Sequence, residues 1–195
     1  MRVFAMTAIE AIAVALGLIN IVLIVRRSVW NYPFGIAMVV LYAHIFWKAQ
    51  LFSDAGLQVF FLVVQLYGWL AWAQHRESDG SVVVRELGPP SRLGWLLGSL
   101  LITLVWGTIM QQYTTASFPY WDASVAMLSV VAQLLMTWRY VENWWWWIAV
   151  DVLSIGLYAA KGLWLTTGLY GVFLVLAVLG LLQWRRHLSD AAETV

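Results

Sequence analysis

Residues 56–72 read GLQVFFLVVQLYGWLAW, and residues 168–184, placed 112 positions later, read GLYGVFLVLAVLGLLQW. Both segments begin with Gly-Leu, contain Phe-Leu-Val, and end with a glycine followed four residues later by a tryptophan. Roughly 20 apolar helical residues cross the 30 Å hydrocarbon core of a bilayer. The two segments therefore predict two copies of one membrane-spanning helix.

The similarity continues over most of the chain. Residues 10–75 align without a gap with residues 122–187, and 20 of these 66 positions are identical. Coincidence between hydrophobic segments is the alternative explanation, because an apolar composition raises chance identity. Matches at Gly, Asn, Trp and His favour a true repeat. They are Asn31/Asn143, Gly56/Gly168, Gly68/Gly180, Trp72/Trp184 and His75/His187.

The composition is that of an integral membrane protein. Of 195 residues, 63% are hydrophobic and 11% are charged, and no cysteine is present to form a disulfide or thiolate site. A formal net charge of +1 argues against a nucleic-acid partner. Glu10 interrupts the first apolar run, so we expect a spanning helix there and not a signal peptide. We predict transmembrane helices at 6–25, 32–50, 54–73, 94–111, 121–138, 143–160 and 165–184.

The repeat and the helix count predict the architecture. A unit of three helices would alternate its orientation unless one further crossing intervened. The expected fold is all-α, with seven transmembrane helices in a three-plus-one-plus-three arrangement and two parallel repeats, as is typical of transporters. The predicted segments are a first repeat at 1–74, a linker at 75–93, a connecting helix at 94–112, a second repeat at 121–186 and a tail at 187–195.

The basic residues predict an orientation. With the N-terminus outside, inner segments hold eight Lys and Arg residues and outer segments hold three. This distribution favours an outside N-terminus and a cytoplasmic C-terminus. The linker would then be cytoplasmic, and its mixed charges, Gly and Pro predict a solvated segment.

Four consecutive tryptophans occur within YVENWWWWIAVDVL, residues 140–153. On a helix, Trp144, Trp147 and Asp151 share a stripe about 80° wide with Ser154 and Tyr158. Trp145 and Trp146 point to other sides, so we predict that they are membrane-interface or packing residues. Trp144 and Trp147 are predicted to belong to a polar interior face.

Asp151 has two interpretations. A carboxylate near the middle of a bilayer costs at least about 2.5 kcal/mol and normally faces protein or water. It is either a protonated or hydrogen-bonded packing residue, or a partner for positive charge in a substrate pathway. Two indoles beside a carboxylate would suit a flat cationic ring.

Two glutamines add polar groups to the first repeat. Gln58 and Gln65 are seven residues apart and share one helix face. Their amides either connect helices or bind a ligand. Tyr170 and Ala177 occupy the equivalent positions of the second repeat. This difference between the halves is expected if one asymmetric small molecule binds between them.

Two acidic residues lie near the predicted outer ends of helices. Glu10 and Asp122 are equivalent positions of the two repeats. We predict an acidic outer vestibule that concentrates cations. The alternative for Asp122 is a helix N-cap favoured by the helix dipole.

Several other classes of protein are disfavoured by the sequence. A retinal protein would need a lysine in the last helix, and residues 165–184 contain none. His44, His75 and His187 lie on separate segments, so no catalytic or metal site is predicted and the chain is not expected to be an enzyme. No cofactor is predicted, and the ATP-binding motif G-x-x-x-x-G-K-[ST] is absent. A structural membrane protein remains the alternative.

The motifs also resemble a known family. NYPFGI, LQVFF and YGWLAW in the first repeat, and FPYWDASVAMLS, RYVENW and KGLW in the second, are similar to the PnuC family of bacterial vitamin transporters. The resemblance covers about Glu10 to Trp184. It implies a seven-helix fold with repeats like those of SWEET proteins, and a homotrimer in the bacterial inner (cytoplasmic) membrane.

The resemblance further implies facilitated diffusion of nicotinamide riboside, trapped by phosphorylation in the cytoplasm, whereas some relatives carry thiamine or riboflavin. It implies substrate-binding roles for Asn143, Trp144, Trp147, Gln58 and Gln65. The family pattern has asparagine where this chain has Asp151 and Gln65. We therefore expect a small cationic vitamin precursor as partner, nicotinamide riboside first and thiamine second.

Overall fold

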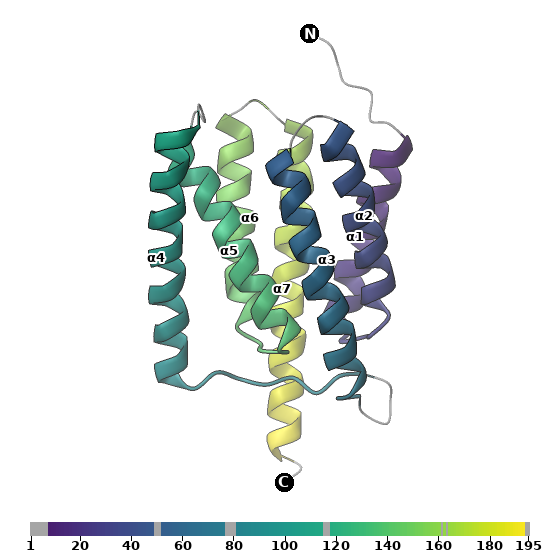
Figure 1. Cartoon of the computed structure of the whole chain (residues 1–195). Coiled ribbons are helices and arrows are strands. Elements are labelled where there is room, and N and C mark those ends of the chain that lie inside the picture. Colours follow the sequence, from purple (N-terminus) through teal and green to yellow (C-terminus); the bar gives the residue numbers. More distant parts are fainter. Residues whose placement is uncertain are drawn as a thin grey trace. The chain divides into compact units, whose positions relative to one another are not determined.

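The computed structural model describes residues 8–48, 52–76, 81–114, 118–160, 162 and 164–193. These residues form seven α-helices and a few isolated β-bridges (Figure 1). The helices are α1 (Ala8–Val25), α2 (Asn31–Lys48), α3 (Phe52–Ala73), α4 (Pro89–Tyr113), α5 (Pro119–Thr137), α6 (Asn143–Ala160) and α7 (Trp164–Glu193). The prediction of an all-α protein is confirmed.

The helix ends differ from prediction mainly in α4 and α7. α4 begins at Pro89 and not at residue 94, because Pro89 and Pro90 occupy the first turn, where a missing N–H breaks no helical hydrogen bond. α7 continues to Glu193, so most of the predicted tail at 187–195 is helical.

Five helices are long and apolar enough to cross a membrane, judged by length and composition: α1, α3, α4, α5 and α7. α2 contains a shorter apolar stretch, Asn31–Ile45. Tryptophans and Asp151 lower the hydropathy of α6. The sequence thus identified all seven helices, and hydropathy supports five of them as spans.

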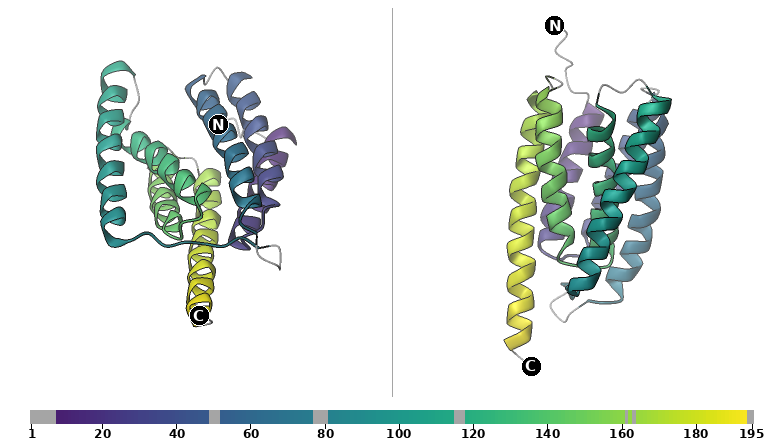
Figure 2. Two further views of the ribbon diagram at one scale, coloured as in Figure 1. Left: turned by 60° about the horizontal axis from the view of Figure 1, so that its bottom comes forward. Right: turned by 90° about the vertical axis from the view of Figure 1, so that its left-hand side faces the viewer.

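The chain divides into two compact units, Met1–Val83 with α1–α3 and Val84–Val195 with α4–α7. In the first unit α2 packs against both α1 and α3. In the second unit α5 packs against α4 and α6, and α6 packs against α7. Consecutive helices within each unit run in opposite directions (Figures 1 and 2).

The turn between α1 and α2 has the same conformation as the turn between α5 and α6. Arg27 has a φ of 56° and Arg139, 112 positions later, a φ of 63°, both in the left-handed region. Asn31 and Asn143 each donate a side-chain hydrogen bond of 2.7 Å to the carbonyl three residues earlier. Each asparagine thereby fixes the chain where the next helix begins.

In the first unit, α2 and α3 meet through an aromatic pair beside a glycine. The rings of Tyr32 and Trp72 are 5.5 Å apart at 87°. Gly68, one turn before Trp72, lets the Tyr32 ring approach, because a Cβ there would lie 2.6 Å from the Tyr32 hydroxyl oxygen. We call this arrangement the ring–glycine contact.

The second unit has the same ring–glycine contact between α6 and α7. The rings of Trp144 and Trp184 are 5.5 Å apart at 88°. A Cβ on Gly180 would lie within 2.6 Å of three ring atoms of Trp144. The three residues are equivalent to Tyr32, Trp72 and Gly68 at the 112-residue offset, so the repeat is present in packing as well as in sequence.

Candidate functional site

One face of α6 carries buried polar groups. Asn143 is 0%, Asp151 4% and Ser154 0% exposed. Two polar atoms near the start of the helix, Asn143 Oδ1 and Trp144 Nε1, have no hydrogen-bond partner within the described parts of the chain. Such atoms are costly to bury without a partner, so this face has unused capacity to bind a polar ligand.

Asp151 lies near the middle of α6. It makes no ion pair with any residue that the structure describes, and neither α5 nor α6 carries a lysine or arginine. On α7, the ring of Tyr170 lies 5.2 Å from that of Tyr158 of α6. Burial of a carboxylate without an opposite charge is unfavourable. A ligand that supplies a cation would remove this cost.

The four tryptophans have different surroundings. Trp145 is 47% exposed and lies under the guanidinium of Arg185, 5.3 Å from the ring centre. Trp147 is half-buried on α6. Trp146 packs against the apolar cluster of Leu87, Val131 and Leu135. The surroundings of Trp145 and Trp146 are those expected for interface and packing residues.

Trp144 has a packing role that the sequence did not reveal. Its side chain is 2% exposed, and its ring makes the ring–glycine contact with Trp184 and Gly180. A ligand would therefore meet the Nε1 edge of Trp144 more readily than its face. Of the predicted aromatic pair, Trp147 is the better candidate for stacking.

In the first unit, buried amides surround Gly35 of α2. A Cβ on Gly35 would lie 2.6 Å from Asn20 Nδ2 of α1 and closer still to Gln65 Oε1 of α3. Asn20 also donates a hydrogen bond of 2.8 Å to the carbonyl of Asn31. Gln65 is 7% exposed, and the predicted partner Gln58 is half-buried. The structure thus brings Gln65 close to Asn20. Asn20 was not among the predicted site residues, although it interrupts an apolar run.

The second unit fills the equivalent positions differently. Trp147 stands in place of the glycine, and Ala132 and Ala177 stand in place of the two amides. Both alanines are buried, at 0% and 3% exposure. The small alanine side chains leave room for the indole of Trp147. The first repeat thus combines a glycine with two amides, and the second repeat combines an aromatic ring with two alanines.

Glu10 and Asp122 each lie in the first turn of a helix, α1 and α5 respectively. The N-cap of α5 is Phe118, so the interpretation of Asp122 as an N-cap is wrong. Its position in the first turn still suits an anion, because the helix dipole is positive there. The outer vestibule remains a prediction.

Residues 85–87 of the linker dock on the rest of the second unit, which differs from the predicted solvated segment. The backbone of Arg85 donates to the Arg139 carbonyl at 2.8 Å and accepts from the Val141 amide at 2.9 Å. Both carboxylate oxygens of Glu142, which is 3% exposed, accept the Leu87 amide at 3.1 Å. Arg92 Nε completes the site with a hydrogen bond of 2.8 Å to Glu142.

Comparison with known proteins gives consistent results. The family described as nicotinamide mononucleotide transporter matches residues 7–186. The nicotinamide riboside transporter PnuC of Escherichia coli strain K12 is 31% identical over 201 residues, covering 90% of this chain and 84% of that protein. The riboflavin/roseoflavin transporter RibM of Streptomyces davaonensis is 28% identical over 173 residues, covering 87% and 80%.

A solved structure agrees with these relatives. The crystal structure of the vitamin B3 transporter PnuC superposes with a TM-score of 0.75 at 26% identity, over 91% of this chain and 80% of that chain. Helix content, apolar spans and sequence similarity all point the same way. The chain therefore belongs to the PnuC family of transporters and is a multi-pass membrane protein.

Proposed function

We propose that this chain carries nicotinamide riboside across the bacterial inner membrane by facilitated diffusion. The relatives named for this substrate support the proposal. The observation that carries it is the buried Asp151, which has no ion pair in the described structure. The pyridinium ring of nicotinamide riboside is a flat cation, and such a ring complements a carboxylate beside indoles.

The riboside is a better candidate than its mononucleotide. A phosphate is normally bound by arginine or lysine, and α5 and α6 contain neither. A second anion near Asp151 would also be repelled. We infer that the uncharged ribose end enters the site, and that phosphorylation in the cytoplasm traps the product.

In the proposed site each predicted residue has a chemical role. Asp151 pairs with the charged ring, and Trp147 stacks on it with help from the edge of Trp144. Asn143 offers its unpaired Oδ1 to a ligand hydroxyl or amide. Gln58 and Gln65 of the first repeat stay predicted substrate-binding residues.

Thiamine is the second candidate, because it also contains a cationic ring. Riboflavin, whose name one relative carries, has an uncharged ring system and would leave Asp151 without a partner. A structural membrane protein with no ligand is the alternative from another class. Titration of the purified protein with nicotinamide riboside, thiamine and riboflavin separates these candidates, since a structural protein would bind none.

We also propose the three-plus-one-plus-three arrangement, with an outside N-terminus, a cytoplasmic C-terminus and a homotrimeric assembly. The matching turns and ring–glycine contacts of the two repeats support this arrangement. In this orientation Glu10 and Asp122 lie near the outer surface, where their charges would attract a cationic substrate.

Transport by facilitated diffusion has a direct test. Proteoliposomes that contain the purified chain should take up radiolabelled nicotinamide riboside until the inner and outer concentrations are equal. The sequence has no ATP-binding motif, and Asp151 is the only ionisable acid on α6, so a proton relay is not expected. Uptake that concentrates the substrate under a proton or sodium gradient would contradict the proposal.

Substitution of the tryptophans tests the helical face. Trp147→Ala should weaken nicotinamide riboside by about 1 kcal/mol, because one stacked ring is lost. Trp145→Leu and Trp146→Leu should leave the affinity nearly unchanged. Isothermal titration of the four single variants measures the difference, with Trp144→Ala expected to lose stability as well. Equal losses at all four positions would show that the assigned face is wrong.

A further inference from the structure

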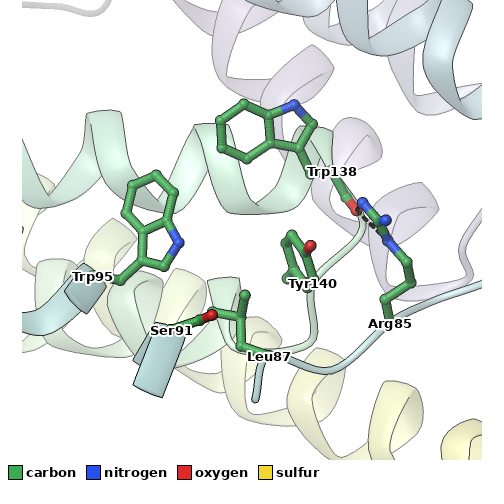
Figure 3. A pocket seen from close by; sticks show the side chains of 6 residues that line it. All are labelled: Arg85, Leu87, Ser91, Trp95, Trp138 and Tyr140. Carbon is green, nitrogen blue, oxygen red and sulfur yellow. Dashed lines mark hydrogen bonds between the residues drawn. The ribbon is translucent and has the colours of Figure 1, made fainter. Parts of the chain in front are cut away.

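A pocket of about 360 Å³ lies in the second unit (Figure 3), and none of its lining residues belongs to α6. It lies where the docked linker meets the start of α4 and the turn that follows α5. Arg85 and Trp95 stand on opposite sides of it, with Tyr140 between them (Figure 3). The lining residues are Arg85, Leu87, Ser91, Trp95, Trp138 and Tyr140.

We expect the pocket to lie at the level of lipid headgroups. α4 begins at Pro89 and α5 ends at Thr137, and both helices are candidate membrane spans. Five of the six lining residues lie within four positions of these helix ends, and Trp95 lies in the second turn of α4. Two indoles 5.9 Å apart, Trp95 and Trp138, are typical of the boundary between hydrocarbon and water.

Arg85 is held in position for an anion. Its Nη2 and Nε atoms donate to the Trp138 carbonyl at 2.9 Å and 3.3 Å, and its guanidinium lies 4.6 Å from the centre of the Tyr140 ring. A guanidinium has five N–H donors, so two bonds leave three donors without a partner in the described residues. These donors suit phosphate oxygens.

The pocket is cationic despite two carboxylates nearby. Arg92 forms ion pairs with both Glu86 and Glu142, and Glu142 also accepts the Leu87 amide. Neither carboxylate lines the pocket, and Arg85 is the one charged residue that does. Ser91 and the ring N–H of Trp95 are further potential donors.

An apolar surface continues from the pocket along α4. Ile102 and Ile109 follow Trp95 at intervals of seven residues on the same helix face, and they are 43% and 39% exposed. Such a surface suits acyl chains when the headgroup occupies the pocket. A free phosphate ion would make no use of it.

We propose that this pocket binds the phosphate of an anionic phospholipid, with Arg85 as its main contact. The proposal is independent of the transported substrate. Residues 85–87 of the linker create the pocket by docking on the turn between α5 and α6. The lipid would therefore bind beside the α5–α6 turn and stabilise the docked linker.

Native mass spectrometry of the purified full chain tests the proposal. Dioleoylphosphatidylglycerol should bind in preference to dioleoylphosphatidylcholine. Arg85→Gln should weaken phosphatidylglycerol roughly tenfold, the order expected for loss of a charge-assisted hydrogen bond. Arg185→Gln is the matched control, because Arg185 also stacks on an indole, but the cavity that it lines contains Glu86 and Glu142. This control should keep the preference.

Three results would overturn the proposal. Equal losses in both variants would show general attraction of charge, and no loss in Arg85→Gln would remove Arg85 from the site. Displacement of the lipid by inorganic phosphate, but not by chloride at the same ionic strength, would assign the pocket to a free anion. If Arg85→Gln does not fold, Arg85→Lys keeps the charge without the fork of donors. An affinity of this variant for phosphatidylglycerol equal to that of the unchanged protein would refute the proposal.

Discussion

Gly180→Ala should destabilise the protein by about 1–3 kcal/mol, because it adds a methyl group where the packing has no space. The new Cβ would meet three ring atoms of Trp144 within 2.6 Å. Trp144 is 2% exposed and its ring rests on Trp184, so it has little freedom to move away. The same displacement should move α6 and weaken substrate binding.

Gly171→Ala is the matched control on the same helix. No atom lies within 4 Å of the position that its Cβ would take. Alanine is the better helix former, so this variant should be unchanged or up to about 1 kcal/mol more stable. Thermal unfolding in detergent compares the two variants. A Gly180→Ala protein as stable as Gly171→Ala would mean that Trp144 does not rest on α7.

Asp151→Asn should weaken the binding of nicotinamide riboside about tenfold. The attraction between the carboxylate and the charged ring is worth roughly 3 kcal/mol, and the desolvation of both charges offsets about half of it. The amide keeps nearly the same volume and an acceptor oxygen, so the substitution isolates charge from packing. Dihydronicotinamide riboside has a similar shape but an uncharged ring. Its affinity should be the same for both proteins.

Binding titrations of both ligands to both proteins measure this selectivity. Thiamine should follow the cationic pattern if it enters the same site. An equal loss for the charged and the uncharged ligand would assign Asp151 to helix packing. No loss for either ligand would remove it from the binding site.

The helices could be predicted from the sequence because apolar runs of membrane length have few other structures available. α6 begins and ends where it was predicted, at 143 and 160. The start of α4 was missed because two prolines suggested a loop, although proline is favourable in a first turn. The continuation of α7 to Glu193 was not predicted, because the apolar pattern ends near residue 184. The helix continues through the polar residues that follow.

Candidate site residues on one helix were easier to predict than those that depend on contacts between helices. Ser154 and Asp151 share a face because of helical spacing alone. The packing role of Trp144 depends on Gly180, 36 positions later in the sequence. The hydrogen bond from the Leu87 amide to Glu142 joins residues separated by 55 positions, and no local sequence pattern predicts it.

The ring–glycine contact separates what holds each repeat together from what distinguishes the two repeats. A gene duplication starts with identical halves, and any later change must leave both halves able to fold. Here the aromatic pair and the glycine hold the second and third helices of each half together. At another position of the same helices, Gly35 in one half corresponds to Trp147 in the other. Substitutions at positions such as Gly35 and Trp147 can therefore change substrate specificity in one half of the chain. The ring–glycine contact that holds the helices of each half together need not change.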